Sequence, residues 1–269
     1  MTMTAKHDRW ISGQSYDQYM GRWSRMIAEK FVDWVDPPAN ADWLEVGCGT
    51  GALTKTILSK ATPRSILATD LSDGFVAFAQ NENEDKRVQF EVADASQLPC
   101  PDGSKDIVTS ALVLNFLPDK QKAFAEMRRV LEPDGFIAFY VWDYPGGGMS
   151  FIDTFWKTAA EIDARAAELD ECVRFPFCQK DGLDQLCQSA GIKRAEIEAL
   201  DVETRFPDFE ALWYPFTLGV GPAPGYVGTL TEKQKTDLKA RLSAKFVSEG
   251  SISLPARAWA VKAKWPEEG

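Results

Sequence analysis

Hydrophobic residues in the first half of the chain fall into short runs rich in valine, isoleucine and aromatic residues, and amphipathic stretches separate several of these runs. Short apolar runs predict strands, whereas apolar positions three or four apart predict helices. Strands that alternate with helices are typical of a doubly wound α/β sheet, which binds ligands at the carboxyl ends of its strands. The predicted strands cover residues 43–46, 65–69, 88–92, 107–112 and 136–142, and the first two are followed by helices up to residues 60 and 81.

The pattern changes before and after this alternating region. Upstream, apolar residues at helical spacing predict a helix over residues 16–35, which Pro37 and Pro38 end. Downstream, three glycines at 146–148 form a flexible connector by composition, and we expect a helical insertion after it. The remaining predicted elements are a helix over 181–189, a strand over 196–202, a Pro/Gly-rich loop over 219–228, a helix over 231–248 and a strand over 257–265, whose alternation is that of a strand half exposed or near an edge.

The composition excludes several classes of function. The 269 residues include 30 basic and 40 acidic side chains, and the net charge of −10 disfavours a nucleic-acid partner. No apolar run suits a leader or a membrane span, so we expect a soluble, cytoplasmic protein without a membrane partner. His7 is the only histidine, which argues against a histidine triad or a polyhistidine metal centre. The cysteines match no common zinc spacing and are expected to be free thiols: Cys48, Cys100, Cys172, Cys178 and Cys187.

A glycine-rich turn follows the first predicted strand. Gly47, Gly49 and Gly51 let the backbone turn sharply and approach a ligand, beside the unpaired N–H groups that begin the next helix. The third glycine comes one residue earlier than in the GxGxxG dinucleotide fingerprint, which disfavours a pyrophosphate ligand. Asp70 ends the second strand, where a carboxylate can accept hydrogen bonds from both hydroxyls of a ribose. Asp94 follows the third strand and is placed to accept from an exocyclic amine such as that of adenine.

These motifs, in this order, resemble those of class I S-adenosylmethionine (SAM)-dependent methyltransferases of the small-molecule, UbiE-like type. Residues 44–51 resemble the family's first motif, and residues 131–135 resemble its LxPGG turn, with Asp134 in place of the first glycine. The resemblance covers residues 14–142 well and the rest in outline. The residues through which it implies SAM binding are Tyr16, Tyr19, Arg22, Trp23, Glu45, Gly47, Cys48, Gly49, Gly51, Asp70, Leu71, Asp94, Ala95, Ala111 and Leu112.

The resemblance implies a Rossmann-like, seven-stranded, mostly parallel sheet with an antiparallel last strand, an N-terminal cap helix and a helical insertion after the fifth strand. We expect a single methyltransferase domain over residues 1–269, with a cofactor-binding half at 14–142 and a substrate lid with C-terminal strands at 143–269. SAM is the expected cofactor and S-adenosylhomocysteine (SAH) the expected product, and no metal is expected. The oligomeric state stays open.

The second half of the chain bears on the acceptor. Residues 153–210 hold 14 acidic and 7 basic side chains, which indicate either a solvated helix face or a field that attracts cationic substrates. Aromatic residues also gather there, and a few of them are expected to line a largely apolar pocket. We therefore expect a small-molecule substrate that is aromatic or cationic.

Methyl transfer from a sulfonium is an in-line displacement that needs alignment more than a protein nucleophile, although an alcohol or carbon acid would also need a base. Where the family's fourth-strand loop often carries histidines, this chain has Asn115 and Phe116. We expect Asn115 to orient the acceptor and Asp143 and Tyr144 to supply any proton chemistry. Two alternatives stay open: an NAD(P)-dependent oxidoreductase, which shares the sheet and the ribose acid, and a SAM-binding protein without methyl transfer.

Overall fold

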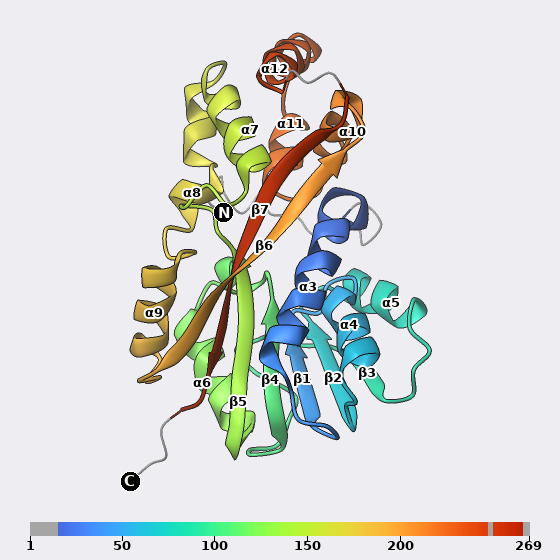
Figure 1. Ribbon diagram of the computed structural model, residues 1–269, viewed down its shortest axis with the longest axis vertical. Coiled ribbons are helices and arrows are strands. Elements are labelled where there is room, and N and C mark those ends of the chain that lie inside the picture. The colour runs from blue at the N-terminus through green and yellow to red at the C-terminus, as the bar shows by residue number, and fades with distance from the viewer. Residues whose placement is uncertain (1–15, 247–249, 266–269) are drawn as a thin grey trace.

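The structure is a computed structural model that describes residues 16–246 and 250–265, so His7 lies outside the described residues. Its strands form one seven-stranded sheet in the order β3-β2-β1-β4-β5-β7-β6 (Figure 1). The first five strands are parallel, and β7 runs antiparallel to both β5 and β6, which confirms the predicted topology. The strands are β1 (Asp42–Val46), β2 (Ser65–Asp70), β3 (Val88–Val92), β4 (Lys105–Ala111), β5 (Leu131–Trp142), β6 (Ala195–Phe206) and β7 (Ile252–Ala263).

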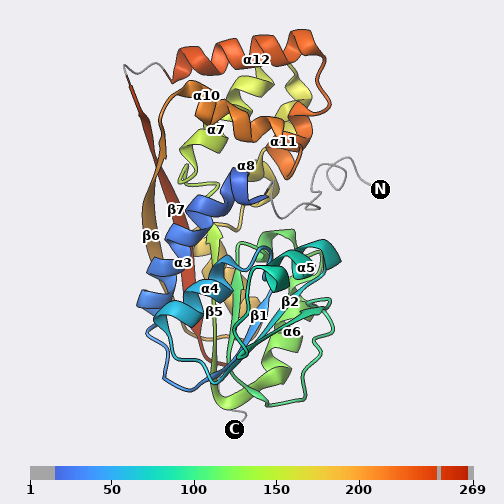
Figure 2. The same ribbon diagram turned by 90° about the vertical axis from the view of Figure 1, so that its right-hand side faces the viewer.

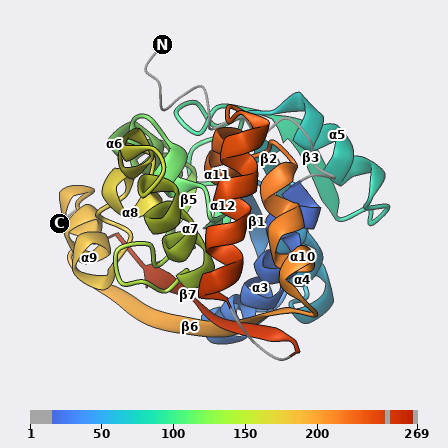
Figure 3. The ribbon, with the colours of Figure 1, turned by 90° about the horizontal axis from the view of Figure 1, so that it is seen from above.

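Helices cover both faces of the parallel strands, with α3 and α4 on one face and α6 and α9 on the other (Figure 3). The predicted N-terminal helix is present as a π-helical turn, η1, that continues into α3. The helical elements are η1 (Asp17–Gly21), α3 (Arg22–Val35), α4 (Ala52–Lys60), α5 (Asp73–Asn81), η2 (Leu114–Phe116), α6 (Lys120–Val130), α7 (Ser150–Ala160), η3 (Ala164–Glu168), α8 (Glu171–Arg174), α9 (Lys180–Ser189), α10 (Phe209–Trp213), η4 (Tyr214–Thr217), α11 (Pro222–Val227) and α12 (Glu232–Lys245).

Successive side chains of β1 point to opposite faces of the sheet and therefore pack against different helices. Trp43 joins the buried cluster that includes α3 and α4, whereas Leu44 and Val46 join the cluster that includes α6 and α9. By the same alternation Glu45 points to the face of α4, where Thr54 is its hydrogen-bond partner. The hydrophobic pattern that folds this strand therefore also buries a carboxyl group.

A second layer of helices lies above the carboxyl ends of the parallel strands. It contains α7, α10, α11 and α12, and the long strands β6 and β7 reach from the sheet into it (Figures 1 and 2). The prediction of a loop over residues 219–228 is wrong for residues 222–227, which form the helix α11. A proline suits the first turn of a helix, where its missing N–H is not needed.

The boundaries of three C-terminal elements also differ from the predictions. β6 runs four residues beyond the predicted end at residue 202, and β7 begins five residues before the predicted start at residue 257. These added residues pair with each other, from Glu203 opposite Pro255 to Phe206 opposite Ile252. The helix predicted over 231–248 ends at Lys245, and the last two positions of that prediction lie outside the described residues.

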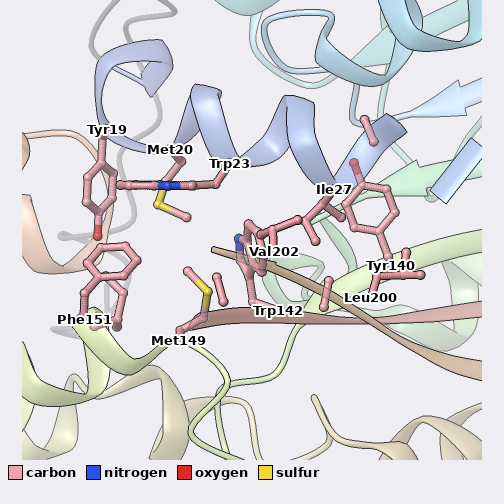
Figure 4. Close-up of a cluster of buried hydrophobic side chains, with 14 of the residues drawn as sticks. Tyr19, Met20, Trp23, Ile27, Tyr140, Trp142, Met149, Phe151, Leu200 and Val202 are labelled. Atoms are coloured by element: carbon pink, nitrogen blue, oxygen red, sulfur yellow. The ribbon is translucent and has the colours of Figure 1, made fainter. Parts of the chain in front are cut away.

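Aromatic packing holds the N-terminal helix between the sheet and the helical layer. The ring of Trp23 lies 5.0 Å from that of Phe151 in α7 and 5.3 Å from that of Phe206 in β6, measured between centroids. Figure 4 shows Tyr19, Met20 and Trp23 facing Phe151 and their neighbours across this cluster. The segment that the sequence predicts as a cap is therefore packed over the carboxyl ends of the strands.

Candidate active site

The glycine-rich turn between β1 and α4 has the backbone conformation that its sequence predicts. Gly47, Gly49 and Gly51 have φ angles of 77°, 52° and 80°, in the left-handed region that favours glycine. The amides of Gly47 and Cys48 donate to the carbonyl oxygen of Thr69 at 2.7 and 2.8 Å, which fixes the turn against β2. Apart from Gly49 itself and its two chain neighbours, no atom of the described chain lies within 4 Å of a Cβ added at Gly49, so a ligand can approach this backbone closely.

Asp70 at the end of β2 is tied to the glycine turn. One of its carboxylate oxygens accepts from the Gly49 amide at 2.9 Å, and the other accepts from the Ser72 amide at 2.9 Å. Burial raises the pKa of Asp70 above its usual value, and the backbone N–H donors oppose that shift. The bonds hold the carboxylate in one orientation beside the turn, where its remaining lone pairs can accept from hydroxyl groups.

Glu45 places a second carboxyl group behind the turn. It is fully buried, and its Oε2 accepts from the Thr54 hydroxyl at 2.5 Å. Its Oε1 is buried without a hydrogen-bond partner, although a buried carboxyl oxygen normally has one. Burial raises the pKa of Glu45 to about 8, opposed by the bond from Thr54. This oxygen therefore has an unused capacity to accept a hydrogen bond.

A cavity of about 560 Å³ extends from the glycine turn to the helical layer. Its walls include Trp142 at the end of β5 and, from the helical layer, Met149, Ile152 and Pro222. None of these four was predicted as a site residue from the sequence. The predicted cofactor residues that the structure brings together around this cavity are Tyr16, Tyr19, Glu45, Gly47, Cys48, Gly49, Asp70, Leu71, Asp94, Ala95, Ala111 and Leu112.

Three predicted cofactor residues do not line the cavity. Arg22 is exposed and donates to the carbonyl oxygen of Arg205 at 3.1 Å, away from the glycine turn. Trp23 is buried in the aromatic cluster described above. Gly51 is the N-cap of α4, so it shapes the turn rather than the cavity wall.

Of the three predicted catalytic residues, only Tyr144 lines the cavity. Asp143 is buried and accepts from the Gly146 amide at 2.9 Å, so its carboxylate holds the turn after β5. Asn115 is buried in η2 and its Nδ2 has no hydrogen-bond partner among the described residues. Tyr144 presents its side chain to the cavity, and burial raises the pKa of its phenol well above the usual value.

Glu171 is the charged residue of the cavity that the sequence prediction missed. It begins α8 inside the acidic region of residues 153–210, and it is only 3% exposed. One of its carboxylate oxygens accepts from the indole Nε1 of Trp156. No local pattern distinguishes Glu171 from the exposed acidic residues around it, because its burial depends on packing against distant elements.

The described residues contain no group of three or more histidine, cysteine, aspartate or glutamate side chains placed to hold a metal ion. All five cysteines are free thiols, as predicted. Burial raises the pKa of Cys48 well above its usual value, so the thiol beside the glycine turn stays protonated. Across the same described residues, every helix falls short of the length and apolar character that a membrane span requires.

Comparison with known proteins agrees with this geometry. A methyltransferase domain family matches residues 44–139. Malonyl-(acyl-carrier protein) O-methyltransferase from Geobacter sulfurreducens is 30% identical over 188 residues, which cover 70% of this chain and 67% of that protein. The ubiquinone/menaquinone biosynthesis C-methyltransferase UbiE from Ectopseudomonas mendocina is 34% identical over 108 residues, which cover 38% of this chain and 42% of that protein.

A solved structure shows the same fold over nearly the whole chain. Phosphoethanolamine N-methyltransferase 2 from Haemonchus contortus, in complex with SAM, superposes with a TM-score of 0.58 at 16% identity, covering 95% of this chain and 57% of that one. The sequence relatives and the fold thus agree with the family that the sequence motifs resemble. The chain belongs to the class I SAM-dependent methyltransferases.

Proposed function

We propose that this protein transfers the methyl group of SAM to a small-molecule acceptor held at the helical-layer end of the cavity. The observation that carries this proposal is the continuity of the cavity, which is lined by Gly47 and Asp70 at one end and by Tyr144 and Ile152 at the other. A donor held by the glycine turn and an acceptor held under the helices would share one space. Aligning two bound reactants supplies roughly 7 to 11 kcal/mol towards the barrier.

The residues around the glycine turn fit SAM by their chemistry. The unpaired Oε1 of Glu45 fits the α-ammonium group of the methionine part, and the Asp70 carboxylate fits the ribose hydroxyls. Asp94 and Ala95 line the same cavity at the end of β3 and fit the adenine. When bound, SAM supplies a methyl group on a positively charged sulfur, which is a good leaving group.

Tyr144 fits a role in orienting the acceptor, since it is the predicted catalytic residue that lines the cavity. Asp143 and Asn115 lie outside the cavity lining, so we propose that they position its wall and do not touch the acceptor. Asp143 would act by holding the turn through the Gly146 amide, which keeps Tyr144 in place. The expected chemistry is therefore alignment by Tyr144 and the surrounding walls.

Substitution of Asp70 by alanine tests the cofactor end of this proposal. We expect Asp70→Ala to weaken SAH binding by about 1 to 3 kcal/mol, because the ribose hydroxyls lose a charged acceptor. Isothermal titration calorimetry measures the change, and Asp73→Asn is the matched control, since Asp73 is an exposed acid at the start of α5. Unchanged SAH affinity in Asp70→Ala would refute the ribose role, and binding of NAD but not SAH would refute the proposed function.

Substitution of Tyr144 by phenylalanine tests the acceptor end. Once a screen of small molecules for SAH release has found an acceptor, we expect Tyr144→Phe to lower kcat/KM roughly tenfold, the worth of one hydrogen bond. Tyr214→Phe is the control, because Tyr214 is an exposed tyrosine that does not line the cavity. The same kcat/KM in wild type and Tyr144→Phe would end this assignment, and a screen without any SAH release would argue for a binding protein.

A further inference from the structure

The acceptor end of the cavity contains a single buried carboxyl group, that of Glu171. It enters the cavity from α8, beneath the helical layer, while the other acids of the cavity lining, Glu45, Asp70 and Asp94, lie at the carboxyl ends of β1, β2 and β3. One of its oxygens is held by the Trp156 indole, which fixes the carboxyl group in place. The structure thus holds a rigid, desolvated acid on the side of the cavity away from the glycine turn.

Two phenols stand near this carboxyl group. The charge of Glu171 contributes to the raised pKa of both Tyr19 and Tyr144, and both tyrosines line the cavity. Tyr19 is only 3% exposed and Tyr144 is half-buried, so what is exposed of their side chains lies largely in the cavity. Two phenols and a carboxyl group that line one end of a cavity can pair with a polar group of a ligand.

The charges around the cavity select the kind of polar group. Among the described residues, its lining includes no lysine, arginine or histidine. The charged groups that act on Glu171 are Arg174 and Asp170, its neighbours along the chain, and neither lines the cavity. A carboxylate or phosphate bound beside Glu171 would therefore find no cationic side chain in the cavity lining, whereas a cationic or hydrogen-donating group would be satisfied by the carboxylate.

The remaining walls at this end suit the body of such a ligand. Trp142, Met149, Ile152 and Pro222 provide apolar and aromatic surface around the two phenols. Aromatic faces also attract cations, which adds to the attraction of the carboxylate. An organic amine with an apolar or aromatic skeleton matches both features.

We propose that the methyl acceptor is an organic amine whose nitrogen docks against the Glu171 carboxylate, which takes the proton that the nitrogen must lose before methyl transfer. This inference rests on the proposed function. The ammonium gives a proton to a Glu171 oxygen, and the freed lone pair forms the new nitrogen–carbon bond. The carbon–sulfur bond of the donor breaks with its electron pair left on sulfur, and Glu171 returns its proton to solvent when the methylated ammonium leaves.

The protonation behaviour of Glu171 agrees with this role. Burial raises the pKa of Glu171 to about 8, opposed by its own backbone amide, by the Trp156 indole and by the charge of Arg174. An ordinary carboxylate is a far weaker base and would leave an alkylammonium protonated and unreactive. A base is most effective when its pKa lies near the working pH, so burial brings Glu171 into the useful range.

The test compares ligands that differ only in the group presented to Glu171. Phenethylamine, tryptamine and naphthylmethylamine are each titrated beside the alcohol and the carboxylic acid of the same skeleton, with SAH present, and binding is followed by calorimetry and thermal shift. We expect the amines to bind at least tenfold more tightly than their alcohols and acids. Glu171→Gln should abolish this preference and leave the affinity for SAH unchanged. Glu168→Gln is the matched control, since Glu168 is an exposed acid in η3.

The outcomes separate the two proposals. A preference for amines that disappears in Glu171→Gln and persists in Glu168→Gln supports the inference. If SAH binds but no amine binds better than its alcohol or acid, or Glu171→Gln keeps the preference, the inference is overturned while the proposed function stands. If SAH itself does not bind to the wild type, the proposed function fails first. The unchanged SAH affinity of Glu171→Gln also shows that the variant is folded.

Discussion

Replacement of Gly47 by alanine is expected to weaken the binding of SAH roughly 100-fold, the sum of a left-handed backbone penalty and an overpacked contact. Gly47 has a φ of 77°, and a Cβ at this position would overlap the methyl groups of Val113. Val113 lines the cavity, so neither group can move without reshaping the site. The displaced backbone would carry the Gly49 amide away from Asp70. Calorimetric titration with SAH measures the loss.

Two further variants separate the causes of this effect. Gly191 has a φ of 81° after α9, and an added Cβ would meet no atom of the described chain within 4 Å apart from its own residue and its two chain neighbours. We expect Gly191→Ala to lower the melting temperature but to leave SAH affinity unchanged, because Gly191 carries the backbone penalty and does not line the cavity. Adding Val113→Ala to Gly47→Ala should restore part of the affinity by removing the collision. Wild-type affinity in Gly47→Ala would contradict the assignment of the turn as the cofactor site.

The parallel half of the fold could be predicted because its signals are local. Each of the first five strands is a short apolar run, and the glycine turn carries its own backbone requirement in Gly47, Gly49 and Gly51. The alternation of strands and helices then leaves few topologies, since parallel strands need crossover helices. Asp70 and Asp94 follow from the same reasoning, because Asp70 ends β2 and Asp94 closely follows β3, and the carboxyl ends of these parallel strands lie on the same side of the sheet.

The C-terminal boundaries depend on pairing between distant segments. The tips of β6 and β7 have an exposed side, and β7 contains Pro255, so their local pattern is weaker than that of the buried strands. Their length is set by the register that pairs Glu203 with Pro255 and Phe206 with Ile252. The helix α11 is similar: its six residues include two prolines and a glycine, and it forms where Tyr226 packs against Trp156.

The acceptor end of the site could not be predicted from sequence in the same way. Glu171 belongs to a stretch of acids that reads as a solvated helix face, and most of that stretch is exposed or half-exposed. It packs with Trp156 of α7 and lies near Tyr19 of η1 and Tyr144 of the turn after β5, which are distant in sequence from one another. Asp143 differs from Glu171, because its position after β5 predicts proton chemistry, whereas the structure shows one of its oxygens accepting from the Gly146 amide outside the cavity lining.

Substitution of Glu45 by glutamine is expected to stabilise the empty protein while weakening its affinity for SAH. Glu45 has a pKa of about 8 in the folded state and about 4.5 when unfolded, so ionisation favours the unfolded chain. Because the pKa is higher in the folded state, Glu45 lowers the free energy of unfolding only where the unfolded chain ionises it. This destabilisation is absent below about pH 4.5 and grows as the pH rises to about 8. At neutral pH the glutamine should therefore raise the free energy of unfolding by about 3 kcal/mol, measured by urea denaturation.

The same substitution should change how SAH binding depends on pH. An ammonium group beside Oε1 favours the ionised form of Glu45, so the wild type should release a proton on binding at neutral pH and bind more tightly as the pH rises towards about 8. Glu45→Gln should bind roughly 10- to 100-fold more weakly, the worth of a charged hydrogen bond, and its proton release should be lost. Calorimetry in buffers of different ionisation enthalpy measures that release.

The exposed acid Glu168 provides the control for both effects of this substitution, since Glu168→Gln should alter neither stability nor proton release. Glu171→Gln gives a second comparison: its carboxyl also has a pKa of about 8 when folded, so it should stabilise the empty protein similarly without changing SAH affinity. A Glu45→Gln variant that binds SAH with wild-type affinity and proton release would show that the unpaired oxygen does not meet the cofactor. If Glu45→Gln is more stable but binds SAH as well as the wild type, the buried carboxyl group destabilises the fold and does not contribute to binding. If the variant is both more stable and weaker in binding, the carboxyl group is buried at the expense of stability because it recognises the ligand.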